Sequence, residues 1–368
     1  MEWLKGRDRI ELRQELGRPI RLGAPSELAV SDAERVRTLI RSGDAAAAKD
    51  FFGLLHPIYS AVVSTFLEWA LAMPNVLAAM GHEARVSKVL SQSYNWWLEG
   101  EDAATSVYPA AALLKEIFSP ENISTKTVVS YREEQTNGVS QLGEQLLGPV
   151  NNLYQEVLRL IDEDCLEPAV SSFEVYLREV RLRHDLIGQY VSSAISAIAD
   201  IVNQTIAEDV MQEALESCAL LKGMWSVFEK LPPEALAATL AEHLRAHYSG
   251  EGRQGAVQII EEKDCFRLIF EPCGTGGAMR QGKVPGLRVL KEASPATWSL
   301  ANQVPSYCAH CAKNEITSIE KMGYPAWVTE FNPDPDKPCG WTVYKDPALI
   351  PERYFARLGL SKGDILKK

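Results

Sequence analysis

Apolar residues recur at helical spacing through most of the first two thirds of the chain. Between residues 51 and 98 the large apolar side chains fall three or four positions apart, as they do on the buried face of an amphipathic helix. They include Leu55, Ile58, Val62, Phe66 and Trp69. Residues 149–230 show the same spacing. The pattern predicts a scaffold of long helices, each with one buried face.

Local signals mark where these helices begin and end. Ser31, followed three positions later by Glu34, is typical of a capping box. Gly43 favours the end of that helix, and Asp44 favours a new helix start. Pro74 is expected to divide the long apolar run into two helices, because proline lacks an amide hydrogen and clashes with the preceding turn.

The periodicity changes after residues 249–252, where serine and glycine mark a break. Between Phe266 and Phe270 every second residue is apolar and faces one side, which is typical of a half-buried strand. One helix is expected between Pro305 and Gly323. Four strands of one antiparallel sheet are expected, at residues 256–262, 265–271, 326–331 and 340–345.

The fold class that follows is α+β. The N-terminal two thirds is mostly helical, and the C-terminal third is an antiparallel sheet of about four strands with one crossing helix. We expect a helical domain over residues 1–150, a helical cap region over 151–250 and an α+β domain over 251–368. Residues 1–30 are charged and irregular, which predicts an arm packed on the body. Residues 124–131 are rich in β-branched side chains, which favours a strand or an extended loop.

Composition and charge restrict the class of protein. The chain is 46% hydrophobic and 24% charged, which is ordinary for a globular protein, and its formal net charge is -11. Such a chain lacks the basic face that neutralises phosphates, which excludes a general nucleic-acid binder. We therefore expect a small-molecule substrate and no nucleic-acid partner, and we leave a homodimer open.

The sequence contains no convincing membrane or export signal. The stretch Met1-Glu2-Trp3-Leu4-Lys5 is too charged for a secretory signal. The most apolar run, residues 58–80, carries Glu68 and Pro74, so we interpret it as a buried helix and expect no membrane span. These features predict a cytoplasmic protein.

The cysteines are the clearest candidates for chemistry. Four of the seven lie between residues 273 and 339, namely Cys273, Cys308, Cys311 and Cys339. Cys308, Cys311 and Glu315 are spaced i, i+3 and i+7, so they fall within about 60° on one helix face. In a chain without an export signal, this spacing favours metal binding or thiol chemistry over disulfides.

Two kinds of metal site fit this pattern. If all four thiolates bind one Zn²⁺ ion, the site is closed and structural. If three bind Zn²⁺ or Fe²⁺, an open position holds water, and Glu315 or His310 is the candidate acid or base beside it. Cys273 follows a strand and precedes a glycine-rich segment, residues 274–286, which we expect to be a loop. His310 is more typical of a neighbour of the site than of a ligand, because it points away from the cysteine face.

Two other interpretations of the cysteines stay open. Free cysteine is among the most buried residue types, so inert core packing competes with a metal site. The C-x-x-C pair formed by Cys308 and Cys311 at a helix start also suits thiol redox chemistry, since the helix dipole lowers a thiol pKa.

The order of elements resembles a known group of proteins. The features that carry the resemblance are the lead-in Ser42-Gly43-Asp44 with Leu54-Leu55-His56, and the C-terminal order of a strand, Cys273, a helix with cysteines and an acid, a strand, and Pro338-Cys339 before a last strand. This order resembles the 2-aminothiazoline-4-carboxylate hydrolase-like proteins and the vinyl-reductase-type small-molecule-binding domains, mainly over residues 180–350. The resemblance implies a small-molecule pocket under a helical cap, and in the hydrolase case C–N ring opening of a small heterocyclic acid.

Three functions follow. The first is a metal-dependent enzyme, with zinc or iron, that hydrolyses a C–N bond of a small anionic or heterocyclic substrate. The second is a small-molecule-binding or sensor protein with a structural zinc. The third is a thiol oxidoreductase that uses Cys308 and Cys311.

Overall fold

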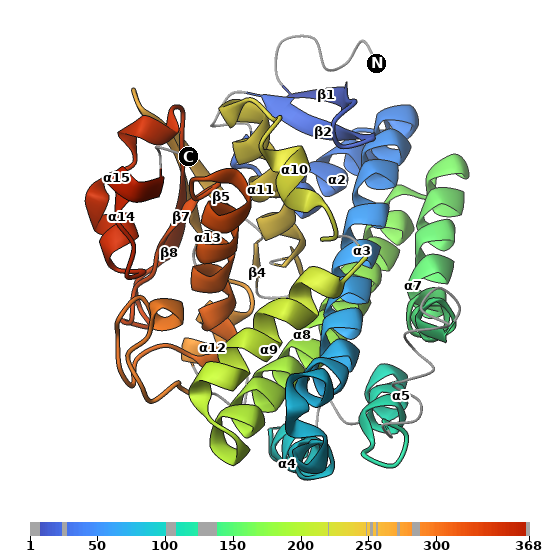
Figure 1. The fold of residues 1–368 in the computed structure, drawn as a ribbon. Helices are drawn as coiled ribbons and strands as arrows, with labels where there is room; N and C mark the ends of the chain where they lie inside the picture. Colours follow the sequence, from blue (N-terminus) through green and yellow to red (C-terminus); the bar gives the residue numbers. More distant parts are fainter. Residues whose placement is uncertain are drawn as a thin grey trace.

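The computed structural model describes residues 8–23, 28–100, 108–123, 138–219, 221–247, 249–250, 253–254, 257–270, 273–281 and 288–365. Long helices form one side of the molecule, and the C-terminal sheet with its short helices forms the other (Figure 1). The class is α+β with a mostly helical N-terminal part and a C-terminal antiparallel sheet of four strands, which confirms the predicted fold class.

The helical side is built from seven principal helices of the described chain. They are α2 (Asp32–Arg41), α3 (Ala45–Leu77), α4 (Glu83–Glu99), α5 (Pro109–Phe118), α7 (Gly138–Asp162), α8 (Leu166–Ile201) and α9 (Gln204–Ser217). The predicted starts are confirmed: the Ser31 hydroxyl accepts from the Glu34 amide and the Asp44 carboxylate accepts from the Ala47 amide, both at 3.1 Å. These caps satisfy amides that have no partner inside the helix.

The expected break at Pro74 is wrong. Helix α3 continues through Pro57 and Pro74, and the interruption comes in a π turn, η1 (Ala78–His82). Gly81 has a φ of 86° there, a conformation that side-chain-bearing residues adopt only with strain. The residues around Pro74 are buried, and their packing offsets the one hydrogen bond that the proline removes.

The C-terminal sheet has the strand order β5-β6-β8-β7, and all its pairs are antiparallel. Its strands are β5 (Val257–Glu261), β6 (Cys265–Phe270), β7 (Val328–Glu330) and β8 (Cys339–Tyr344). Helix α13 (Ala309–Met322), predicted to cross the sheet, packs beside β7 and α9, whereas α11 (Pro233–Ala246) packs on β5, β6 and β8. Two helices therefore contact the sheet where the sequence predicted one.

Several smaller elements were not predicted from the sequence. They are the hairpin β1 (Asp8–Arg13) and β2 (Arg18–Gly23), the pair β3 (Ser249–Gly250) and β4 (Arg253–Gln254), and the short helices α10 (Met224–Phe228), α12 (Gly276–Arg280), α14 (Glu352–Ala356) and α15 (Lys362–Ile365). The expected irregular arm is thus wrong for residues 8–23, because Gly17, with a φ of 64°, closes a hairpin. The expected loop after Cys273 contains α12, and the segment 124–131 lies outside the described residues.

The hydrophobic core spans the three predicted domains. One apolar cluster runs from α2 and α3 through α7, α8 and α9 to residues near the C-terminus, and a second fills the space between the β1–β2 hairpin, α11 and the sheet. The predicted boundary at residue 150 falls inside α7. Asp32 accepts from Arg21 at 3.0 Å and pairs with Arg245 at 3.1 Å, all three being buried, so the hairpin, α2 and α11 are joined.

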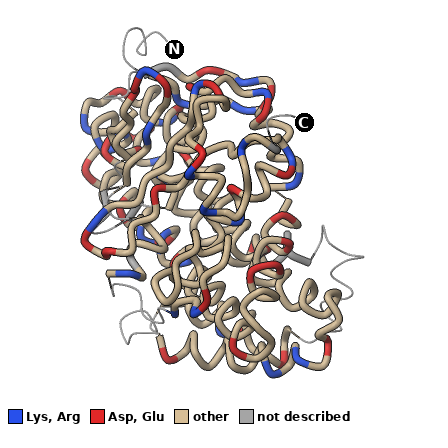
Figure 2. Tube along the Cα trace, turned by 60° about the vertical axis from the view of Figure 1, so that its left-hand side comes forward, with Lys and Arg blue, Asp and Glu red and all other residues tan. Residues whose placement is uncertain are grey.

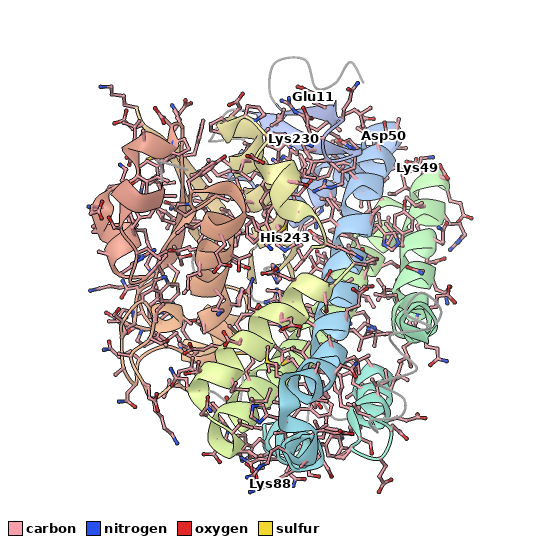
Figure 3. The ribbon with its side chains drawn as sticks, in the orientation of Figure 1. Glu11, Lys49, Asp50, Lys88, Lys230 and His243 are labelled. Carbon is pink, nitrogen blue, oxygen red and sulfur yellow. The ribbon has the colours of Figure 1, made fainter. Side chains whose placement is uncertain are left out.

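Charged residues lie mostly on the outside. Figure 2 shows acidic and basic residues interspersed along the trace, and Figure 3 shows Lys49, Asp50 and Lys88 at the periphery while His243 lies near the middle. The helical stretch 45–99 is long and apolar enough to cross a membrane, but 67% of its apolar window is buried inside the fold. Most of this window therefore packs in the core.

Candidate functional site

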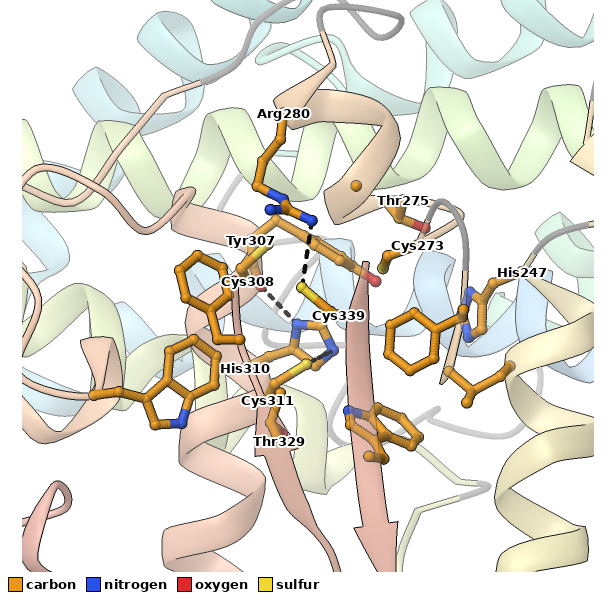
Figure 4. A pocket seen from close by; sticks show the side chains of 16 residues that line it. His247, Cys273, Thr275, Arg280, Tyr307, Cys308, His310, Cys311, Thr329 and Cys339 are labelled. Carbon is orange, nitrogen blue, oxygen red and sulfur yellow. Dashed lines mark hydrogen bonds between the residues drawn. The ribbon is translucent and has the colours of Figure 1, made fainter. Parts of the chain in front are cut away.

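The four cysteines singled out from the sequence line one cavity beside the sheet (Figure 4). Cys273 follows β6, Cys308 and Cys311 belong to the start of α13, and Cys339 begins β8. The pairing of β6 with β8 sets Phe270 opposite Cys339, which brings the chain after β6 close to the start of β8. Sheet register thus unites cysteines that are far apart in sequence.

Helix α8 fixes the start of the cysteine-bearing helix. The hydroxyl of Ser306, two residues before Cys308, lies 3.1 Å from the Ser192 hydroxyl and 2.9 Å from the Ser196 hydroxyl. All three hydroxyls are buried, so they satisfy one another in place of water. This contact holds the segment before α13 against α8.

The thiols form one electrostatic group. Each of the four interacts with the other three, so ionisation of one disfavours ionisation of its neighbours. Burial is the larger cause, and it raises the pKa of Cys308 and Cys311 well above the usual range and that of Cys339 to about 11. None of the four is in a disulfide. Without a cation Cys308, Cys311 and Cys339 are therefore neutral thiols at pH 7.

The glycines beside Cys273 allow the backbone to approach the sulfurs. A Cβ atom on Gly276 would lie less than 3.0 Å from the Cys308 sulfur and 4.0 Å from the Cys273 sulfur. A Cβ atom on Gly188 of α8 would lie 3.2 Å from the Thr275 methyl group. Gly276 therefore has no room for a side chain, and Gly188 permits the close approach of Thr275 to α8.

Arg280 brings a positive charge to the cavity. Its Nη2 donates to the Cys339 sulfur at 3.3 Å, and its Nη1 donates to the carbonyl oxygens of Asn332 and Asp334. Among the described residues that line this cavity, Arg280 is the one lysine or arginine. The site can therefore attract an anion or stabilise a thiolate.

The thiols are spread around the cavity and do not meet at one point. In the part of the chain that the structure describes, no three His, Cys, Asp or Glu side chains are arranged to hold a single metal ion. Around one tetrahedral zinc, ligand sulfurs lie about 3.8 Å apart, given a Zn–S bond of about 2.3 Å. The donor chemistry suits a soft metal, but the described thiols are not arranged around a single ion.

Glu315, a predicted acid or base, is not among the residues that line the cavity. Its Oε2 accepts from Arg357 at 2.7 Å, and its Oε1 accepts from the Thr329 amide at 2.7 Å and from the Trp298 indole at 3.4 Å. Burial raises its pKa, and the Arg357 guanidinium opposes that rise. The carboxylate joins α13 to β7 and to the C-terminal segment, so its partners assign it a structural role.

His310, the other predicted acid or base, does face the cavity. Its Nδ1 donates to the Tyr307 carbonyl oxygen at 2.6 Å, because that oxygen can only accept. Its Nε2 then carries the lone pair and lies 3.6 Å from the Cys311 sulfur. Burial lowers the pKa of His310 to about 4, which keeps the ring neutral. The expectation that it neighbours the thiols agrees with this position.

Histidines that the sequence analysis did not assign to the site form an adjoining wall. Nε2 of His184 on α8 lies 2.7 Å from Nδ1 of His247 after α11, and Nδ1 of His184 lies 3.0 Å from the Asp185 carboxylate. The His243 ring packs edge-on against the His247 ring, with ring centroids 5.2 Å apart. Two local patterns in the sequence involve these residues: His243 and His247 are spaced i, i+4, and His184 is followed by Asp185. Neither pattern predicts the contact between His184 and His247, which are 63 residues apart in the chain.

The same helix face holds the thiol segment. Arg181 pairs with Asp185 at 3.0 Å and donates to the carbonyl oxygen of Gly274 at 2.8 Å. Thr275 Oγ1 lies 3.4 Å from Nε2 of His184. The segment after Cys273 and the histidine wall are thus positioned by one turn of α8.

The wall opens on a second cavity that adjoins the first. Tyr307, His310, His247 and Trp341 line both. The thiol side has a volume of about 60 Å³ and the histidine side about 100 Å³, the latter enclosed by Phe66, Trp69 and Trp327 among others. Since one water requires roughly 10–15 Å³ on this scale, the two together accommodate a small ligand.

No protein-family model, curated protein or solved structure matches this chain. The functional assignment therefore rests on the residues of the site.

Proposed function

We propose that this chain is a cytoplasmic metal-dependent enzyme that acts on a small molecule between the thiols and the histidine wall. The observation that carries the proposal is the convergence of Cys273, Cys308, Cys311 and Cys339 on one cavity. Cysteines that serve only as core packing have no reason to gather around a hollow, because a buried apolar cluster is close-packed.

Metal binding accounts for the thiols better than redox catalysis does. A nucleophilic or redox cysteine needs a lowered pKa, whereas burial raises that of Cys308 and Cys311. A bound Zn²⁺ or Fe²⁺ ion would supply Lewis acidity and lower the pKa of a water molecule. Cys273, Cys308 and Cys311 are the proposed ligands, which leaves one position of the ion open for that water, and Cys339 is hydrogen-bonded to Arg280 beside it.

The remaining residues of the cavity suit a small, flat and anionic substrate. Arg280 can bind a carboxylate, and Trp298 stacks on Phe331 with ring centroids 4.7 Å apart, which forms a flat wall. His247 keeps a neutral ring, so it can accept a proton from water or return one to a leaving nitrogen. Together with the resemblance to 2-aminothiazoline-4-carboxylate hydrolase-like proteins, these features favour hydrolysis of a C–N bond in a small heterocyclic acid.

Elemental analysis of the purified protein tests the proposal. Prepared without chelator, the protein should retain at least about one equivalent of zinc or iron, since such ligand sets hold their metal through folding. Cys308→Ser and Cys311→Ser should lower the metal content several-fold. Cys218→Ser and Cys265→Ser are matched controls, because these cysteines lie outside the cavity lining. Less than about a tenth of an equivalent of any transition metal would sink the proposal.

A second candidate is a small-molecule-binding protein whose metal is structural. The observation in its favour is that no Asp or Glu is found among the described residues that line either cavity, so no carboxylate is placed to act as acid or base. In addition, four thiolates bound to one zinc ion would leave no position open for water. The two candidates differ in turnover. Incubation with a panel of heterocyclic carboxylic acids, followed by mass spectrometry, distinguishes a product heavier by one water from a ligand that is bound and released unchanged.

A further inference from the structure

The spread of the thiols indicates what kind of metal group they hold. No three donors of the described chain are arranged for a single ion, yet Cys273, Cys308, Cys311 and Cys339 all line one cavity. The sulfurs of Cys273 and Cys308 flank the same backbone position, Gly276. The four thiols therefore surround a volume and do not meet at a point.

We infer that this volume holds a four-iron, four-sulfide cluster, with one cysteine bound to each iron. This inference rests on the part of the proposed function in which the four cysteines hold metal, and it replaces the single ion with a cluster. In such a cluster each thiolate binds a different corner, so the cysteine sulfurs stand farther apart than the roughly 3.8 Å around a single tetrahedral ion. Each thiol releases its proton when it binds iron.

The size of the cavity agrees with a group larger than one ion. The thiol side has about 60 Å³, several times the roughly 10–15 Å³ that a single water requires. Gly276 lets the backbone lie directly against the Cys308 sulfur, because any side chain there would collide with that sulfur. A cluster would thus fill cavity volume that a single zinc ion would leave empty beside the sulfurs.

The groups around the thiols have the properties that stabilise iron–sulfur clusters. A cluster with four thiolate ligands carries net negative charge, and Arg280 donates to the Cys339 sulfur at 3.3 Å. The aromatic rings of Phe270, Trp298, Phe331 and Trp341 line the cavity and give it apolar walls. Arg181, buried on α8, fixes the segment beside Cys273 through the Gly274 carbonyl oxygen. The cysteine order C-x34-C-x2-C-x27-C reflects three elements that converge on the cluster.

Anaerobic purification with chemical analysis tests the inference. The wild-type protein, reconstituted with ferrous iron and sulfide, should contain roughly four iron and four acid-labile sulfide per chain, with broad visible absorption that bleaches on reduction. Cys273→Ser, Cys308→Ser, Cys311→Ser and Cys339→Ser should each lower both contents at least two-fold. Cys218→Ser and Cys265→Ser should leave both unchanged.

The outcomes separate this inference from the proposed function. Zinc or iron at one equivalent without sulfide would overturn the cluster and leave a metal enzyme standing. If the protein holds no metal after purification without chelator and none after reconstitution, both the cluster and the proposed metal enzyme are overturned. If a cysteine variant does not fold, Arg280→Lys provides a second measurement: it should keep the iron and sulfide contents but shift the reduction potential, because it alters the donor to Cys339. An unchanged potential together with serine variants of full iron content contradicts the assignment.

Discussion

Nε2 of His184 lies 2.7 Å from Nδ1 of His247, and the contact joins α8 to the end of α11 at the wall of the cavity. On its other side, Nδ1 of His184 lies 3.0 Å from the Asp185 carboxylate, which can only accept. Nδ1 of His184 therefore carries the proton and its Nε2 accepts from Nδ1–H of His247. The lone pair of His247 is left on Nε2. Three side chains thus fix which nitrogen of His247 can take a proton.

Asp185→Asn should disturb this order of protons without changing the size of the side chain. The amide can donate to His184, which favours the opposite tautomer in both rings. We expect turnover of a C–N substrate to fall by about 10²–10⁴-fold, with metal content unchanged. Nitrogen NMR of the imidazoles should show Nδ1–H in His184 of the wild type and its loss in the variant.

Asp200→Asn is the matched control, because Asp200 lies on the same helix but bonds only exposed partners such as Gln92. Asp200→Asn should change neither the nitrogen NMR spectrum of the imidazoles nor the turnover of the substrate. Retention of the Nδ1–H signal in Asp185→Asn would contradict the proton order inferred from the distances.

The buried histidines make stability dependent on pH. Burial lowers the pKa of His243 to about 4 and also lowers that of His184 and His247, whereas an unfolded histidine titrates near about 6.5. Below a pH of about 6.5 these histidines bind protons in the unfolded chain but not in the folded chain. The free energy of unfolding is therefore highest above that pH and falls as the pH drops toward 4. Denaturant unfolding at several pH values between 7.5 and 5 should show this decline.

His243→Gln isolates one contribution to that decline. Removing the group should reduce the slope by up to about 1.4 kcal/mol per pH unit in the same window. His82→Gln is a useful comparison, since His82 lies in the π turn and away from both cavities. Equal slopes for His243→Gln and the wild type would show that His243 is not protected from protonation.

Gly276→Ala should damage the site by steric collision alone. The new methyl group would lie less than 3.0 Å from the Cys308 sulfur, so we expect a loss of about 1–3 kcal/mol in the free energy of unfolding and a several-fold loss of bound metal. Gly148→Ala in α7 is the matched control, because its methyl group would meet nothing within 4 Å. Replacing glycine by alanine within a helix there should be neutral or stabilise by up to about 1 kcal/mol.

Glu315→Gln tests the structural role of that carboxylate. The variant keeps the shape but loses the ion pair with Arg357, so the free energy of unfolding should fall by about 1–3 kcal/mol while metal content persists. In an Arg357→Met background, Glu315→Gln should lower the free energy of unfolding by a smaller amount, because the ion pair is already absent. A variant of full stability that loses only turnover would instead return Glu315 to the acid or base role expected from its spacing.

Local patterns predicted much of the fold. Ser31 and Asp44 act within one turn of themselves, so their caps could be read from neighbouring residues. The alternation from Phe266 to Phe270 likewise located β6. The predicted helix break at Pro74 was wrong because the free-energy cost of a proline inside a helix can be offset by burial of the surrounding residues. That burial depends on the packing of the whole core.

The site was predictable only in part for the same reason. Cys308 and Cys311 share a helix turn, so their proximity followed from spacing, and strand order brought Cys273 and Cys339 to them. Helix spacing also placed Glu315 near the thiols, but only the docking of Arg357 and Thr329 decides where its carboxylate is held. The contact of His184 with His247 depends on how α8 packs against α11, and no local pattern encodes that.

The position of β8 has a consequence for biosynthesis. Cys339 is the first residue of the last strand made, yet β8 lies between β6 and β7 in the finished sheet. A nascent chain therefore presents Cys273, Cys308 and Cys311 to the cell before the strand that carries the fourth thiol can be inserted. Metal delivery should consequently follow the synthesis of β8, and a ribosome that stalls before residue 339 releases a product with neither a complete sheet nor a complete ligand set.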